Sequence, residues 1–264
     1  MDLHLGGKTV VITGGSRGIG LACAEVMASE GCRVAIVARD AGRLAEAAAG
    51  VVSRTGGEVH AIAAELQSLE GVQAMVSAAQ ERLGRIDILV NNAGAIRAGN
   101  FLEIPDAQWM EDWSLKLLGY VRASRAVMPL MQQQGGGCIV NVIGAAARQV
   151  NPNYLAGGAA NAALVNFTKG LSDFGAPFKV LVKAVSPGVV ETERWESITV
   201  ATAKAQGRSP EQVRAERLAA FPLGRAARPH EVADVVAFLA SARAQMLNGL
   251  TITVDGGWSR GIYP

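Results

Sequence analysis

The sequence predicts an α/β fold in which a doubly wound, mostly parallel sheet lies between two layers of helices. Short apolar runs alternate along the chain with longer segments of helical pattern, as expected for strands that helices cover on both faces. The expected strands are 9–12, 33–38, 59–64, 86–92, 138–143, 179–185 and 250–254. The expected helices are 21–29, 41–53, 69–83, a long helix from about residue 105, 154–174 and 231–241. Such sheets bind ligands at the carboxyl ends of their strands.

Composition and charge restrict the classes of protein to which the chain can belong. Of its 264 residues, 50% are hydrophobic and 18% are charged, and no repeat or linker interrupts it, so we expect one globular domain over residues 1–264. A net charge of +2 gives no reason to expect nucleic acid or an anionic membrane as a partner. The three cysteines lack metal-ligand spacing and the N-terminus has no apolar signal core, which favours a cytoplasmic protein with reduced thiols.

The segment Thr13–Gly20 joins the first expected strand to the first expected helix with the spacing T-G-x-x-x-G-x-G. Glycines let the backbone turn sharply and approach an anion, which the free N–H groups at the start of the helix then bind. The segment therefore predicts a phosphate site. The alternative is that these glycines only shape a strand-to-helix turn.

Further motifs follow the later strands. They are Asn91-Asn92-Ala93-Gly94, Pro187-Gly188 with Thr192 just after, and Val254-Asp255-Gly256-Gly257. With these motifs, the sequence resembles the short-chain dehydrogenase/reductase family in its compact form, over essentially the whole chain. The resemblance implies a Rossmann-type fold, a nicotinamide dinucleotide cofactor, a small-molecule substrate and a homo-oligomer, either a tetramer or a dimer. It assigns the following residues to the cofactor site: Gly14, Ser16, Arg17, Gly18, Ile19, Gly20, Arg39, Glu65, Leu66, Asn92, Ala93, Gly94, Pro187, Gly188 and Thr192.

The residues after the second expected strand favour NADP(H) over NAD. NAD-binding proteins place an acid there that accepts hydrogen bonds from the ribose 2′-hydroxyl, whereas here Ala38 takes that place and Arg39 follows. A guanidinium suits a 2′-phosphate because it bonds two oxygens at once and stays charged, and Arg17 can lie against the same phosphate. Two alternatives stay open: Arg39 is a solvated loop residue, or Asp40 reaches the ribose and the cofactor is NAD.

The catalytic positions depart from the family pattern. By the family's register, Gly157 and Asn161 replace a tyrosine and a lysine on one helix face. Gly144 replaces a serine after the fifth strand, and Lys116 replaces an asparagine on the long helix. A glycine has no side chain that exchanges a proton, so the usual tyrosine-centred mechanism does not carry over.

Two hypotheses of different class follow. In the first, the site is rewired: Lys116 and Asn161 have exchanged places, an ammonium of lowered pKa lies near the nicotinamide, and Tyr154 supplies a phenol from one turn before Gly157. The protein is then an NADP(H)-dependent oxidoreductase acting on a small carbonyl or alcohol, or a redox-neutral lyase. In the second, it binds a dinucleotide or small molecule without hydride chemistry, as a binding protein or partner subunit. The alternatives without a catalytic role are that Lys116 points to solvent and that Tyr154 is an interface or lid aromatic residue.

The substrate is only weakly indicated. Family substrates lie between the nicotinamide and a lid-like segment, here about residues 191–220, in which Ser209-Pro210 with Gln212 forms a helix start. Arg97 and Arg194, with nearby aromatic residues, suit an apolar or aromatic substrate that carries an acidic group. Arg148 is a further candidate to polarise a substrate oxygen, with pairing to an acid as the alternative.

Overall fold

In a computed structural model, which describes residues 1–260, the strands form one sheet in the order β3-β2-β1-β4-β5-β6-β7, and every neighbouring pair is parallel. The strands are β1 (Thr9–Thr13), β2 (Arg33–Ala38), β3 (Val59–Ala63), β4 (Ile88–Asn91), β5 (Gly137–Val142), β6 (Val180–Pro187) and β7 (Thr251–Val254). The α-helices are α1 (Gly18–Ser29), α2 (Ala41–Thr55), α3 (Leu69–Leu83), α4 (Asp106–Lys116), α5 (Leu118–Gln133), α6 (Leu155–Gly175), α7 (Glu193–Gln206), α8 (Pro210–Ala219) and α9 (Pro229–Ala240). Short 3₁₀ helices are η1 (Ala145–Ala147), η2 (Pro152–Tyr154), η3 (Ala176–Phe178) and η4 (Ala242–Ala244).

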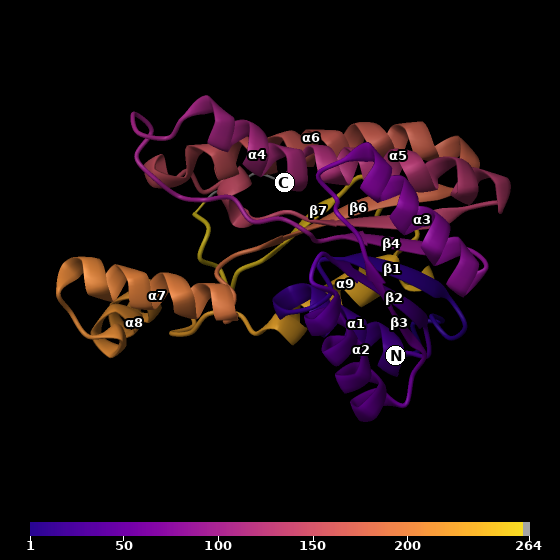
Figure 1. The fold of residues 1–264 in the computed structure, drawn as a ribbon, viewed down its shortest axis with the longest axis horizontal. Helices are drawn as coiled ribbons and strands as arrows, with labels where there is room; N and C mark the ends of the chain where they lie inside the picture. Colours follow the sequence, from indigo (N-terminus) through magenta and orange to yellow (C-terminus); the bar gives the residue numbers. More distant parts are fainter. Residues whose placement is uncertain (261–264) are drawn as a thin grey trace.

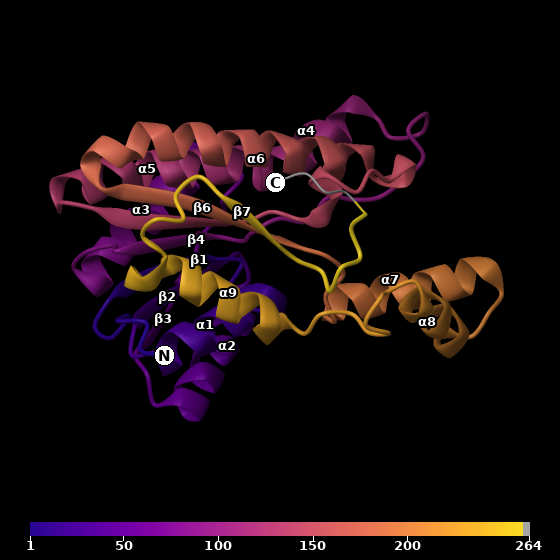
Figure 2. The same cartoon turned by 180° about the vertical axis from the view of Figure 1, so that it is seen from behind.

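Helices cover both faces of the sheet. Helices α1, α2 and α9 lie on one face, and α3, α5 and α6 lie on the other (Figures 1 and 2). The predicted three-layer, doubly wound α/β fold is therefore confirmed, with a sheet that is parallel throughout the described residues.

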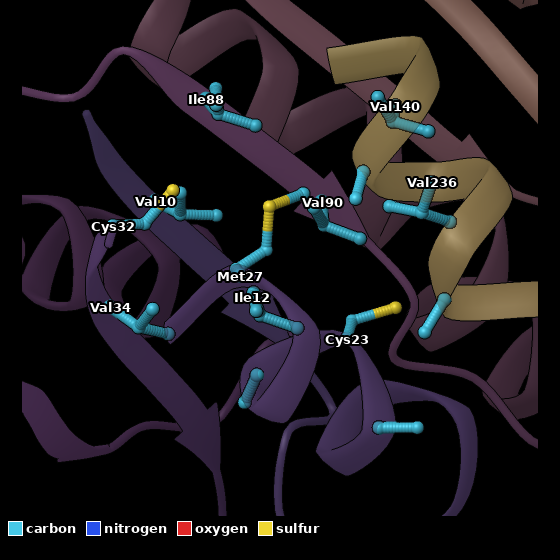
Figure 3. Close-up of a cluster of buried hydrophobic side chains, with 14 of the residues drawn as sticks. Val10, Ile12, Cys23, Met27, Cys32, Val34, Ile88, Val90, Val140 and Val236 are labelled. Atoms are coloured by element: carbon cyan, nitrogen blue, oxygen red, sulfur yellow. The ribbon is translucent and has the colours of Figure 1, made fainter. Parts of the chain in front are cut away.

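The hydrophobic core follows the alternation of side chains along the central strands. Val10 and Ile12 of β1 point to the layer of α1 and α9, where they pack with Met27 and Val236 (Figure 3). Val11 between them points to the opposite layer and packs in the cluster of α3 and α5. Both faces of β1 are thus dry, and the strand register cannot slip without exposing one of them.

The helix after residue 105 is divided, which corrects the expectation of one long helix. Helices α4 and α5 meet at Leu117, and Arg122 donates to the Ser114 carbonyl at 3.1 Å. In a continuous helix that carbonyl would accept a backbone N–H four residues on. The arginine side chain thus takes the place of a backbone hydrogen bond at the junction.

The polar segment of about 191–220 forms two helices, and both views show α7 and α8 extending from the body of the molecule as an arm (Figures 1 and 2). The predicted capping box is present: Ser209 Oγ accepts from the Gln212 N–H at 3.2 Å, and the Ser209 N–H donates to Gln212 Oε1 at 3.1 Å. The start of α7 was not predicted; there the Thr192 hydroxyl accepts from the Trp195 N–H. In the part of the chain that the structure describes, none of the helices has the length and apolar character to cross a bilayer.

Candidate active site

The glycine-rich turn presents an open helix start at the carboxyl end of β1. Gly14 and Gly18 have φ of +68° and +57°, which side-chain-bearing residues rarely adopt. No side chain caps α1, so its first N–H groups face the pocket without an intrahelical or capping acceptor. Gly20 serves packing, because a Cβ there would lie 2.2 Å from the Gly14 carbonyl oxygen. This cradle fits a phosphate group.

The sheet opens beside this turn because the strand order reverses between β1 and β4. Asn92 holds the two strands together at that point: its Nδ2 donates to the carbonyls of Thr13 at 3.0 Å and Gly14 at 3.2 Å. The N–H groups of Asn92 and Ala93 both donate to the Thr13 hydroxyl, at 2.9 and 3.0 Å. Ligands of such folds bind in the crevice at this reversal.

A pocket of about 350 Å³ occupies the crevice. Most of the predicted cofactor residues line it: Gly14, Ser16, Arg17, Gly18, Ile19, Arg39, Glu65, Leu66, Asn92, Ala93, Gly94 and Thr192. Gly20, Pro187 and Gly188 are not in its wall; Pro187 ends β6, and a Cβ on Gly188 would lie 2.7 Å from Asp255 Cβ. The wall also contains Arg43, Glu193 and Arg194, which the sequence did not point to as cofactor residues.

Three arginines line the pocket near β2 and the start of α2. Arg39 lies 3.7 Å from Glu65, whereas Arg17 and Arg43 lie 3.6 and 4.0 Å from the same carboxylate, Glu193 of α7. These side chains are largely exposed, so the pairs are weak and leave the guanidinium groups available to a stronger anion. Arg43 reaches the pocket from the first turn of α2, which is only evident once the helix is placed.

Lys116 is buried, which rules out the alternative that it points to solvent. Its Nζ donates to the carbonyls of Val142 at 2.8 Å and Ile143 at 3.1 Å, and to the Tyr120 hydroxyl at 3.0 Å. Within residues 1–260 no carboxylate pairs with it, and burial lowers the pKa of the ammonium to about 7, with the charge of Arg194 acting in the same direction. Its stem passes Gly94, where a Cβ would lie 2.4 Å from Lys116 Cδ.

Asn161 lies next to the end of β5. A Cβ on Gly144 would be 3.1 Å from Asn161 Nδ2, so the amide borders the space that a side chain at residue 144 would enter. Asn161 is 4% exposed, and its Oδ1 has no hydrogen-bond partner within residues 1–260. A buried acceptor without a partner is uncommon, and a ligand hydroxyl or N–H would satisfy it.

Comparison with known proteins identifies the family. A family model described as enoyl-(acyl carrier protein) reductase matches residues 14–259. Oxidoreductase UcpA of Salmonella typhimurium is 36% identical over 254 residues, which cover 96% of this chain and 95% of the relative. The chain belongs to the short-chain dehydrogenase/reductase family.

Other members of the family match this chain along its whole length. The 3-oxoacyl-[acyl-carrier-protein] reductase FabG of Aquifex aeolicus is 33% identical, over 97% of this chain and 99% of that protein. The crystal structure of L-sorbose reductase from Gluconobacter frateurii, complexed with NADPH and L-sorbose, superimposes with a TM-score of 0.95 and 34% identity, covering 99% of this chain and 100% of that one. The chain is accordingly an oxidoreductase of the short-chain dehydrogenase/reductase family.

Against the family pattern, the space above Gly157 is filled by Tyr154. A Cβ on Gly157 would lie 2.0 Å from Tyr154 Cε1 and 2.1 Å from Cζ, so the ring occupies the place where a side chain at residue 157 would begin. Tyr154 ends η2 and precedes α6, hence it reaches Gly157 from outside the α-helix and not from within its first turn. Gly158 faces the Ala146 carbonyl instead, whose oxygen would lie 3.3 Å from a Cβ at residue 158.

The environment of Tyr154 sets the proton affinity of its phenol. Burial raises the pKa of Tyr154, and the charge of the neighbouring Arg194 guanidinium opposes this shift. Arg97, in contrast, is committed elsewhere: its Nη2 lies 2.6 Å from Glu111 and 2.9 Å from the buried Asp112. Of the two arginines that the sequence associated with an acidic substrate, only Arg194 is placed at the site.

Two glycines of α6 test the placement of the Tyr154 ring. Gly170→Ala has open space at its Cβ and should raise the free energy of unfolding by about 0.5–1 kcal/mol through helix propensity. Gly157→Ala gains the same propensity but displaces the ring, at a cost of about 1–3 kcal/mol. We therefore expect the unfolding free energy of Gly157→Ala, measured in urea, to fall below that of Gly170→Ala by about 1 kcal/mol or more. Equal stabilisation by both substitutions would show that the ring lies elsewhere.

The buried ammonium of Lys116 predicts a specific pH dependence of stability. Its folded pKa lies below the ordinary value, so between pH 7 and 10 the unfolded chain holds a proton that the folded chain lacks. Stability then rises with pH across this window. Comparison with Lys116→Met isolates the effect from other groups: the wild type should gain on the order of 2 kcal/mol relative to the variant between pH 7 and 9. A stability difference that stays constant over this range would contradict the burial of a titrating lysine.

Proposed function

We propose that this oxidoreductase transfers a hydride between NADP(H) and a small carbonyl or alcohol substrate, with Tyr154 as the group that exchanges the proton. The position of the Tyr154 ring above Gly157 carries this proposal. The family's chemistry uses a phenol on this helix face, and the ring of Tyr154 lies against the same face from outside the helix. In this proposal Tyr154 takes over the role of the tyrosine that residue 157 lacks.

The phenol is suited to the donor role. The Tyr154 hydroxyl gives its proton to a substrate oxygen. Burial opposes this step by raising the pKa of Tyr154, whereas the charge of the neighbouring Arg194 guanidinium lowers that pKa and stabilises the phenolate that is left. The bound nicotinamide supplies the hydride.

Asn161 and Lys116 have different roles from those that a simple exchange of positions would give. The unpartnered Asn161 Oδ1 is an acceptor for a hydroxyl or amide of the bound ligands. Lys116 donates to the carbonyls of Val142 and Ile143 and so fixes the end of β5, from which Gly144 faces Asn161. We assign Lys116 as a positioning residue.

The preference for NADP(H) rests on the charges around β2 and α2. Ala38 ends β2 where an NAD-binding protein places its acid, and Arg39 and Arg43 line the pocket beside it. The acid that could read a ribose hydroxyl, Asp40, instead caps α2: its Oδ1 accepts from the Arg43 N–H at 3.0 Å. The structural neighbour L-sorbose reductase was solved with NADPH, which supports the same choice.

A second candidate is a dinucleotide-binding protein without hydride chemistry. One observation favours it: Tyr154, Asn161 and Lys116 are absent from the wall of the pocket as it stands in this structure. The two candidates predict different outcomes once the cofactor is bound: the oxidoreductase converts a substrate, and the binding protein does not.

Fluorescence titration with NADPH and with NADH tests the cofactor site. We expect NADPH to bind more tightly, and Arg39→Ala and Arg43→Ala to weaken NADPH binding about tenfold each, because each removes a charge-assisted hydrogen bond to the 2′-phosphate. Binding of NADH should change by less than about twofold. Arg54→Ala, at the far end of α2 and paired with Glu25, is the matched control.

Equal affinity for both nucleotides, or equal losses in the variants, would overturn the assignment of NADP(H). No binding of either nucleotide would overturn the oxidoreductase mechanism. Tight NADPH binding without oxidation by any carbonyl compound would favour the second candidate.

A further inference from the structure

Arg194 connects the arm to the candidate catalytic centre. It is the second residue of α7, and its Nη2 donates to the Ile96 carbonyl at 2.7 Å. It lines the same pocket as Gly94, and its charge acts on the pKa of the Tyr154 phenol. A guanidinium has five N–H donors, so the bond to Ile96 leaves others for a ligand.

The charge around Arg194 differs from that around the other arginines of the pocket. Arg17, Arg39 and Arg43 each lie within 4.0 Å of a carboxylate. Arg194 forms no ion pair within residues 1–260. This end of the pocket therefore holds a cationic side chain with no carboxylate paired to it. A bound anion would supply the missing negative charge.

An apolar and aromatic cluster lies next to Arg194. Ile96, whose carbonyl Arg194 binds, is 2% exposed and packs with Trp109, Trp113 and Tyr154. The two tryptophan rings contact edge to face with centroids 5.5 Å apart, and Trp113 Nε1 donates to the Ala156 carbonyl at 2.9 Å, which fixes that ring. A ligand that reaches Arg194 thus approaches a cation beside this apolar cluster.

We propose that Arg194 binds the carboxylate of the substrate, and that the substrates are short oxo acids and the corresponding hydroxy acids. The proposal rests on the function proposed above. Arg194 donates to the Ile96 carbonyl and Tyr154 packs against Ile96, so a substrate that engages both side chains has its carboxylate a short distance from the reacting carbon. On reduction the carbonyl carbon takes the hydride, its oxygen takes the Tyr154 proton, and the nicotinamide is oxidised; Tyr154 then regains a proton from solvent.

Matched pairs of acid and ester separate the carboxylate contact from the rest of catalysis. NADPH oxidation is measured with phenylglyoxylate and acetoacetate and with their methyl esters, by the wild type and by Arg194→Met. Arg208→Met, in the loop between α7 and α8 and paired with Glu216, is the control for the arm. For the acids we expect KM to rise about tenfold or more in Arg194→Met, the loss of a bidentate charged contact. For the esters KM should change by less than about threefold, and Arg208→Met should match the wild type.

Calorimetric titration of the NADP⁺-saturated protein with phenylglyoxylate gives a readout that needs no turnover. Binding that weakens about tenfold in Arg194→Met supports the carboxylate site even where no hydride is transferred, in which case the proposed function alone fails. A wild type that reduces the esters as efficiently as the acids, or binds phenylglyoxylate no better than Arg194→Met does, overturns the role of Arg194. Such a result leaves the cofactor and Tyr154 assignments standing.

Discussion

The crossover between β1 and β4 is the constraint on which the site depends. The chain leaves the ends of β1 and β4 in opposite directions, so a crevice opens between them. The hydrogen bonds of Asn92 to Thr13 and Gly14 hold the two strand ends together. The glycine turn, the uncapped start of α1 and the arginines of β2 and α2 all face this crevice because parallel strands end at one edge. The candidate cofactor site is thus a consequence of topology.

The candidate catalytic centre is built from side chains that lie over glycines. Tyr154 lies over Gly157, where a Cβ would meet the ring at 2.0 Å, and the stem of Lys116 passes Gly94, where a Cβ would lie 2.4 Å from Cδ. The Asn161 amide borders Gly144 at the looser distance of 3.1 Å from such a Cβ. Packed interiors do not tolerate close overlap, so a larger residue at position 157 would displace the Tyr154 ring.

The features that the sequence could predict lie within short segments or follow the alternation of apolar runs and helical segments. The phosphate turn, the strand alternation and the Ser209 capping box are encoded in short segments, and the structure has each of them. The division between α4 and α5 depends on Arg122 reaching back to Ser114, and the place of Arg43 depends on how α2 packs. The burial of Lys116 and the pairing of Arg97 with Asp112 likewise arise from contacts between distant parts of the chain. No periodicity or motif carries such information.

In the proposed mechanism Tyr154 performs the proton transfer. This role is tested by the rate of NADPH oxidation with short ketones, oxo acids and esters, for the wild type, Tyr154→Phe and Tyr120→Phe, alongside NADPH affinity. Tyr120→Phe measures the effect of disturbing the buried Lys116, because the Tyr120 hydroxyl binds Lys116 and the Val142 carbonyl. We expect Tyr154→Phe to lower kcat by a factor of about 10² or more with NADPH affinity unchanged. A Tyr154→Phe enzyme that turns over as fast as the wild type would contradict the claim.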